Sequence, residues 1–116
     1  STLDPSLIYD MDGWELKAGD KCEKGSQLRP HIVWFGEEVE KIPEAAELAK
    51  LADIFLIVGT SLNVYPAAGL IDFVPDSAEI YLIDPNEVAP IRRKFNFIRK
   101  SATQGIDTFK EMITST

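Results

Sequence analysis

Apolar residues along the chain gather in short runs, separated by polar stretches that are rich in turn-forming residues. Four of these runs are dominated by branched or aromatic residues and are too short for helices. Such runs are typical of β-strands, and continuous ones of strands buried on both faces. The pattern therefore predicts four short strands, over residues 28–35, 54–58, 80–83 and 95–98.

Three other segments have apolar residues at helical spacing, which predicts helices over 42–52, 67–73 and 106–113. Pro43 suits the first turn of the first helix, and Pro75 stops the second. The stripe expected to face the core of the first helix is Ala45, Leu48, Ala49 and Ala52. The inward face expected for the last is Ile106, Phe109, Met112 and Ile113.

The alternation of strand and helix predicts the fold class. Strand, helix, strand, helix, strand at this spacing favours right-handed crossovers and a parallel sheet. We predict an α/β fold for residues 28–116, as part of a doubly wound, Rossmann-like parallel sheet. Residues 1–27 carry turn signals such as Asp12-Gly13 and are predicted to form an irregular segment rather than a domain.

Composition and charge argue against some classes of function. The 116 residues are 45% hydrophobic with a net charge of −7, which suits a globular protein and argues against nucleic-acid binding. The basic clusters at 92–94 and 99–100 predict a solvated face, with a phosphate-facing patch as the alternative. No apolar stretch approaches the roughly 20 residues of a membrane span and no signal peptide is visible, so we expect no membrane partner and a cytoplasmic location.

Small and polar residues directly follow two of the predicted strands: Gly59, Thr60 and Ser61 after one, Asp84, Pro85 and Asn86 after the next. Ligands of doubly wound sheets bind outside the carboxyl ends of the strands. Backbone amides and hydroxyls there can donate to phosphate or ribose oxygens, and a carboxylate can accept both hydroxyls of an adenosine ribose. Because the chain has no G-x-G-x-x-G, an ordinary strand-to-helix turn at Gly59 and a turn-forming role for Asp84 stay open.

Three segments occur in a characteristic order: "LRPHIVWFGE" (28–37), "VGTSLNVYPAAGL" (58–70) and "LIDPN" (82–86). Together they resemble the carboxyl-terminal half of a sirtuin, an NAD-dependent protein-lysine deacylase. The resemblance covers residues 28–107 and disfavours an unrelated flavodoxin-like domain. It implies NAD as cosubstrate and acyl-lysine proteins or peptides as substrates.

The resemblance also implies roles for individual residues. Those that contact NAD on its adenosine side would be Gly59, Thr60, Ser61, Asp84, Pro85, Asn86 and Ala102. Sirtuins more often carry asparagine at the position of Asp84, although a carboxylate can also accept both ribose hydroxyls.

The residues implied to contact the substrate are Val33, Phe35, Gly36, Glu37, Asn63 and Val64. The peptide would add as an extended strand, Val33 would accept the amide hydrogen of the acyl-lysine, and Phe35 would wall the tunnel for the lysine stem. Trp34 is predicted to pack in the core. His31 is predicted to be a structural histidine in a strand rather than the catalytic base.

The sequence also departs from the family. A sirtuin's zinc is held by two pairs of cysteines, whereas this chain contains Cys22 alone, so we expect no zinc and read residues 1–27 as a remnant of the small zinc domain. The glycine-rich phosphate loop and the His-Gly of the general base are absent, so no catalytic residue is assigned. We expect the chain to be the carboxyl-terminal part of a longer enzyme, with the upstream portion as its partner.

These implications predict a protein-lysine deacylase in which this chain supplies the adenosine-side NAD contacts and the peptide loop. Deacetylation is the expected reaction, and desuccinylation stays open because "RPHIVWFGE" resembles that branch of the family. The chain alone is expected to be inactive. The alternative is a nucleotide-binding or regulatory module without catalysis.

Overall fold

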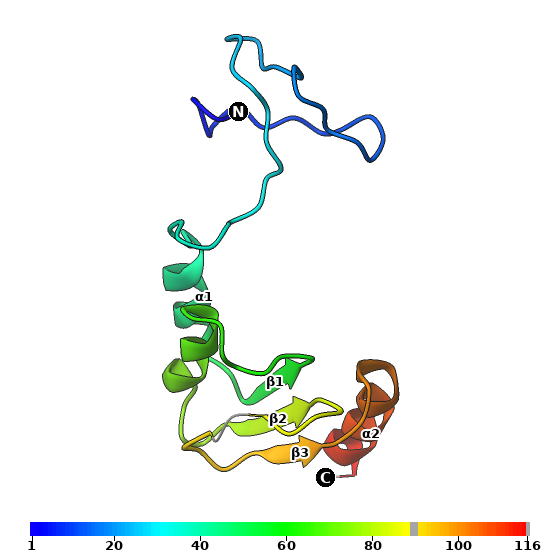
Figure 1. Cartoon of the computed structure of the whole chain (residues 1–116). Coiled ribbons are helices and arrows are strands. Elements are labelled where there is room, and N and C mark those ends of the chain that lie inside the picture. The colour runs from blue at the N-terminus through cyan, green and yellow to red at the C-terminus, as the bar shows by residue number, and fades with distance from the viewer. Residues whose placement is uncertain (89–90, 116) are drawn as a thin grey trace. The chain divides into compact units, whose positions relative to one another are not determined.

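The computed structural model describes residues 1–88 and 91–115. The chain divides into two compact units, Ser1–Glu38 and Val39–Thr116 (Figure 1). The described helices and strands lie in the second unit. Within the described residues, no helix is both long enough and apolar enough to cross a membrane.

A three-stranded parallel sheet forms the centre of the second unit (Figure 1). Its strands, in spatial order, are β1 (Ile54–Val58), β2 (Glu79–Ile83) and β3 (Asn96–Ile98). The register pairs the last residue of β1 with the last residue of β2, and β3 runs parallel to the second half of β2. The α/β fold with a parallel sheet that the sequence predicts is confirmed.

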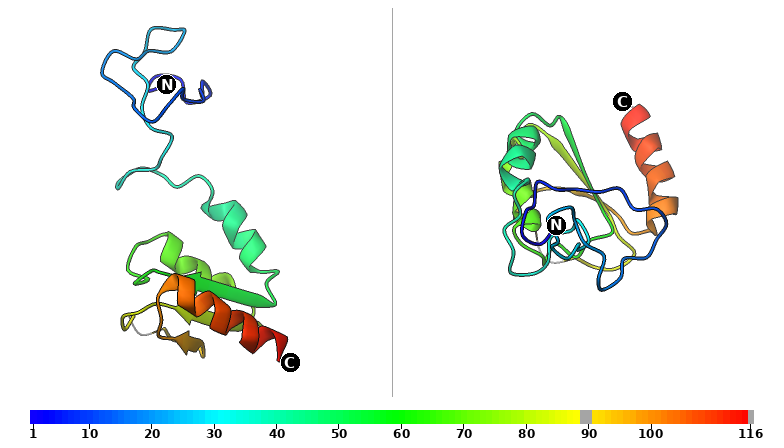
Figure 2. Two further views of the ribbon diagram at one scale, coloured as in Figure 1. Left: turned by 90° about the vertical axis from the view of Figure 1, so that its right-hand side faces the viewer. Right: turned by 90° about the horizontal axis from the view of Figure 1, so that it is seen from above.

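Helices cover both faces of this sheet (Figure 2). One face carries α1 (Ile42–Ala49) and the 3-10 helix η1 (Ala67–Phe73), which pack on Ile57, Ile80 and Leu82. The other carries α2 (Ala102–Thr114), whose Phe109 and Ile113 pack on Tyr81, Ile83 and Ile98. Alternate residues of β2 thus enter two different cores, which explains its unbroken apolar run.

Gly105 lets α2 approach the sheet closely. A Cβ atom at this position would lie 2.2 Å from Cγ2 of Ile83, and Ile83 is fully buried. On the same face, the rings of Tyr81 and Phe109 meet edge to face with centroids 5.0 Å apart. The helix is therefore fitted to the sheet by one missing side chain and one aromatic pair.

The helices differ from their predicted form in three details. α1 ends at Ala49 rather than at residue 52, and it buries Ala46 and Ala49 while Leu48 is 65% exposed. Residues 67–73 form a 3-10 helix. α2 begins four residues earlier than predicted, and Met112 lies outside its buried face. The predicted stripes were shifted because the apolar spacing of a short helix fits more than one face.

Arg93 is not part of a solvated basic face, so that prediction is wrong for this residue. Its guanidinium donates hydrogen bonds to the backbone carbonyls of Ile71, Val74 and Pro75 and lies 3.5 Å from Asp76. These carbonyls belong to the end of η1 and the residues after it, where helical partners run out. Arg93 therefore closes the carboxyl end of η1.

The first unit is irregular, as predicted for most of its length. Among residues 1–38, all of which the structure describes, the only β-pairing is a bridge between Lys21 and Gln27. The strand predicted over 28–35 does not form, because Pro30 has no amide hydrogen and the unit provides no neighbouring strand. Trp34, which was expected in the core, is 52% exposed, and His31 is exposed in a bend.

Candidate functional site

The carboxyl ends of β1 and β2 meet at one edge of the sheet. Val58 and Ile83 are paired, and the amide of Gly59 donates to the Ile83 carbonyl at 2.9 Å. The amide of Asp84 in turn donates to the Ile98 carbonyl of β3 at 3.3 Å. The structure therefore brings together the two strand tips that the sequence predicts as a nucleotide site.

Gly59 begins the turn after β1 with a positive φ of +64°. A side chain there would be strained by this backbone conformation, although its Cβ would meet no atom within 4 Å. Thr60 stabilises the turn that follows, because its Oγ1 accepts a hydrogen bond from the Leu62 amide at 3.2 Å. Ser61 is exposed between them. The tip of β1 is thus an open glycine turn with polar atoms at its surface.

Asp84 holds the turn after β2. The residue is 8% exposed, and its Oδ1 accepts a hydrogen bond from the Asn86 amide at 2.8 Å. This is the turn-forming role that the sequence left open for Asp84. Pro85 and Asn86 are exposed at the tip of the turn.

Ala102 lies at the same end of the sheet as these turns. It is the exposed first residue of α2, which starts four residues after β3 ends. The predicted adenosine-side residues therefore lie beyond the carboxyl ends of β1, β2 and β3, in two turns and at the start of α2. All of them belong to the second unit.

An apolar hollow of about 290 Å³ opens beside the tip of β1. Its lining includes Val58, Thr60, Leu62, Val64 and Ala68. Val64 and its neighbour Asn63 are themselves exposed. Hydroxyls and amides next to an apolar hollow suit a ligand that has both polar and apolar parts.

The predicted peptide loop lies in the first unit, and two charged side chains hold it. Arg29 and Glu37 form a bidentate ion pair, with Nη1 of Arg29 2.7 Å from Oε1 of Glu37 and Nη2 3.1 Å from Oε2. Hydrogen bonding to Arg29, and then to the Trp34 amide, lowers the pKa of Glu37. Phe35, the residue proposed for the tunnel wall, is 91% exposed. Sequence reasoning did not select Arg29, whose only signal was a cation and an anion flanking an apolar run.

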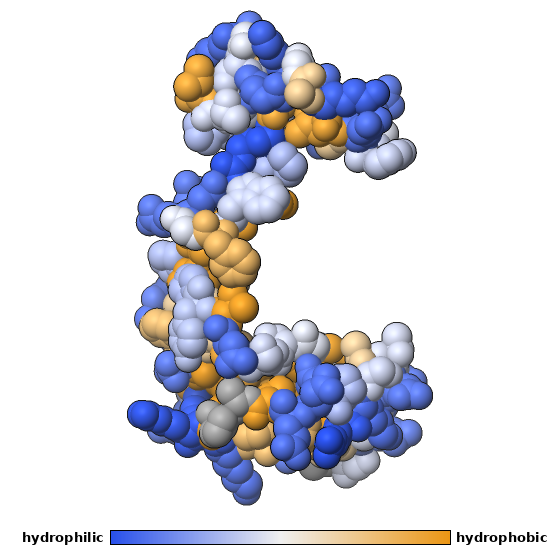
Figure 3. Space-filling model, in the orientation of Figure 1, coloured by the Kyte–Doolittle hydropathy of each residue, from blue (hydrophilic) through white to orange (hydrophobic). Residues whose placement is uncertain are grey.

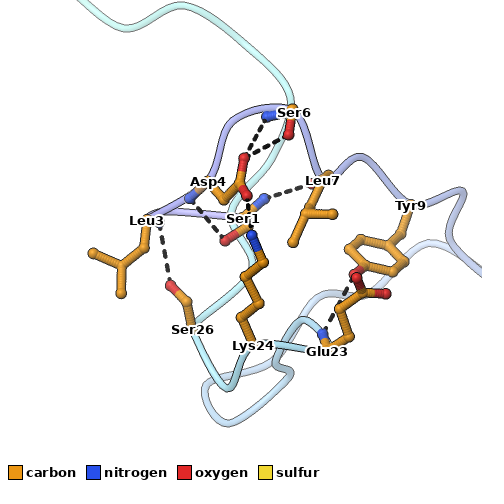
Figure 4. A network of polar contacts seen from close by, with 9 residues as sticks. All are labelled: Ser1, Leu3, Asp4, Ser6, Leu7, Tyr9, Glu23, Lys24 and Ser26. Carbon is orange, nitrogen blue, oxygen red and sulfur yellow. Dashed lines mark hydrogen bonds and ion pairs between the residues drawn. The ribbon is translucent and has the colours of Figure 1, made fainter.

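The surroundings of Cys22 do not fit a zinc site. The buried thiol is hydrogen-bonded to the side chain of Ser1, which lowers the pKa of Cys22. In the same network, the carboxylate of Asp4 is held by Lys24 at 2.7 Å and by Ser6 (Figure 4). Structural zinc needs about four thiolate, imidazole or carboxylate ligands. Across residues 1–88 and 91–115, no group of three or more histidine, cysteine, aspartate or glutamate side chains could hold a metal ion.

A family model and a curated relative both match the sequence of this chain. The model of the Sir2 family matches residues 5–66. A Bacteroides thetaiotaomicron protein named NAD-dependent protein deacylase is 52% identical over 112 residues, which cover 94% of this chain and 48% of that protein. The chain thus spans about half the length of this curated relative.

Solved structures resemble the chain as well. A Sir2 homolog–NAD complex superimposes with a TM-score of 0.69 at 32% identity, over 84% of this chain and 40% of that one. Sir2Tm bound to a propionylated peptide gives a TM-score of 0.62 at 27% identity, over 78% of this chain and 40% of that one.

Proposed function

Because the chain belongs to the Sir2 family, we propose that it supplies the adenosine-side NAD contacts and the peptide loop of an NAD-dependent protein-lysine deacylase. The observation that carries this proposal is the edge of the sheet at which the turns after Val58 and Ile83 meet. A relative named for NAD-dependent deacylation and a structural neighbour in complex with NAD support it.

On the cofactor side, the turn after β1 is proposed to bind the phosphates and ribose through Gly59, Thr60 and Ser61. The turn after β2, formed by Asp84, Pro85 and Asn86, would border the adenine ribose, and Ala102 would line the adenine pocket. The open glycine turn allows a ligand to approach the backbone closely. The buried carboxylate of Asp84 keeps its place through the Asn86 amide, so its position is fixed before a ligand arrives.

On the substrate side, an acyl-lysine peptide is proposed to bind as an added strand. In the first unit, Val33, Phe35, Gly36 and Glu37 form the loop proposed to contact it. In the second unit, Asn63 and Val64 are proposed to contact it as well. The structural neighbour that holds a propionylated peptide supports a peptide as ligand.

When bound, NAD would supply a ribose carbon with nicotinamide as its leaving group. The residues of this chain would hold the ribose and the acyl-lysine together, so that the acyl oxygen attacks in an effectively unimolecular step. No general base is assigned here, and exposed His31 is not proposed as one. We propose acetyl-lysine as the substrate, with succinyl-lysine as the second acyl group to test.

The test is nicotinamide release by the complete enzyme in the presence of NAD and an acetyl- or succinyl-lysine peptide. Release that requires both NAD and the acyl-lysine is expected, and the 116-residue chain alone should release none. Saturable NAD binding by the complete enzyme without release would instead favour the nucleotide-binding or regulatory module.

A further inference from the structure

The segment from Arg29 to Glu37 is closed by its two end residues. The guanidinium of Arg29 binds both carboxylate oxygens of Glu37 and also donates to the Ile32 carbonyl at 3.3 Å. Oε2 of Glu37 accepts the Trp34 amide at 3.2 Å, and the Glu37 amide donates to the Trp34 carbonyl at 3.1 Å. Gly36 completes the turn with a φ of +86°. One ion pair therefore fixes backbone groups at two points inside the loop.

The apolar side chains of this loop are left facing water. Ile32, Val33, Trp34 and Phe35 are all exposed, and Phe35 is the most exposed of them. Apolar side chains also reach the surface elsewhere on the chain (Figure 3), but residues 32–35 form a run of four, longer than the exposed pairs Ile8–Tyr9 and Val64–Tyr65. Consecutive exposed apolar residues on an ordered backbone are typical of a surface that binds a ligand.

We propose that Arg29 and Glu37 are positioning residues, which hold the loop 32–37 in the shape that accepts the acyl-lysine peptide. In this role the carboxylate of Glu37 binds the loop itself, and the peptide contact proposed for Glu37 is made by its main chain. The inference rests on the proposed function, since it specifies how the peptide loop of the deacylase is kept ready.

An isolated surface ion pair would not have this effect, because exposed pairs contribute little to stability. The pair of Arg29 and Glu37 differs in two ways. Its geometry is bidentate, and both partners also form hydrogen bonds to the backbone, Arg29 to the Ile32 carbonyl and Glu37 to the Trp34 amide. Opening it would free these backbone groups, and the peptide would have to order the loop on binding.

The test measures the affinity of the complete enzyme for a fluorescein-labelled acetyl-lysine peptide by fluorescence polarisation. Arg29→Ala and Glu37→Gln should each weaken peptide binding by roughly 5- to 50-fold, as expected when a few residues must be ordered on binding. Their affinity for NAD should stay within about twofold of wild type, since the loop contributes nothing to the proposed NAD contacts. The matched control is Lys41→Ala, which breaks the exposed ion pair between Lys41 and Glu44, with an N–O distance of 2.7 Å. This substitution should leave both affinities unchanged.

Hydrogen exchange provides a readout that does not depend on turnover. The amides of Trp34 and Glu37 should exchange slowly in the wild-type enzyme and faster in Arg29→Ala, with an unchanged melting temperature. A peptide affinity that falls in Glu37→Gln but not in Arg29→Ala would show direct contact of Glu37 with the peptide and overturn the proposal. Equal losses of peptide and NAD affinity would also overturn it, because they indicate a general structural defect.

The outcomes also separate the inference from the proposed function. Peptide affinity that depends on Arg29 in an enzyme that never releases nicotinamide would support the positioning role and refute the deacylase. Turnover with a peptide affinity independent of Arg29 would do the reverse. A wild-type enzyme that binds no acyl-lysine peptide would refute both.

Discussion

Substituting Asp84 by alanine or by asparagine separates its two roles, which are to hold the turn after β2 and to bind the ribose of NAD as proposed. In the structure, its carboxylate holds the turn after β2 through the Asn86 amide at 2.8 Å. Asp84→Ala removes this acceptor, which should lower the free energy of unfolding by about 0.5–1.5 kcal/mol. Asp84→Asn keeps an acceptor oxygen at nearly the same volume, so its stability should change little.

In the complete enzyme, the same residue is proposed to accept the ribose hydroxyls of NAD. Losing charge-assisted hydrogen bonds costs about 1.5–3 kcal/mol, so Asp84→Ala should raise the dissociation constant of NAD by roughly 10- to 150-fold. Asp84→Asn retains one acceptor and should show a clearly smaller loss. Calorimetric titration with NAD measures the affinities, and thermal unfolding measures stability separately. A folded Asp84→Ala enzyme that binds NAD as tightly as wild type would refute the ribose contact.

Three further predictions concern the fold and the metal. Gly105→Ala should lower the free energy of unfolding by about 1–3 kcal/mol, because the added Cβ would overlap the side chain of Ile83. Urea unfolding measures this, and an unchanged midpoint would mean that α2 can shift away from the sheet at no cost. Arg93→Ala should lower the free energy of unfolding by about 1.5–3 kcal/mol and Arg93→Lys by less, whereas equal stabilities would show that the carbonyls after η1 do not need the guanidinium. Elemental analysis of the purified enzyme should find well under one zinc per chain, and a stoichiometric zinc whose chelation unfolds the protein would contradict this.

The sheet was predictable because the sequence of each long strand indicates that the strand is buried on both faces. Residues 54–58 and 80–83 are unbroken apolar runs bounded by polar or turn residues, as strands covered on both faces require. Their parallel pairing then places Gly59 and Asp84 at one edge without any further information. The nucleotide-binding hypothesis therefore depended on topology more than on a motif.

The loop at 28–35 shows where local patterns fail. Its residues favour a strand, but a strand exists only beside a partner, and the partner is not encoded in the segment itself. Trp34 was predicted to pack in the core, although the fold of the first unit leaves it half exposed. For Asp84 the sequence left a ribose contact and a turn-forming role open, and the structure shows the residue buried in a hydrogen-bonded turn.

Long polar side chains were the second source of error. Arg93 reaches carbonyls of residues that lie 18 to 22 positions earlier, and Arg29 reaches Glu37 across a turn. Neither distance corresponds to the period of a helix or a strand, so hydrophobic patterning cannot reveal such contacts. Arg93 in particular binds backbone carbonyls that only the folded chain brings within reach.

The most direct test of the proposed NAD site is an NMR titration of the isotope-labelled complete enzyme with ADP-ribose, which carries the adenosine and both phosphates of NAD. Saturable shifts are predicted for the amides of residues 59–61, of Asp84 and Asn86, and of Ala102, and the amides of β1 before Val58 should move less. Binding that leaves these three turns unperturbed and shifts amides elsewhere would contradict a nucleotide site at the carboxyl edge of this sheet.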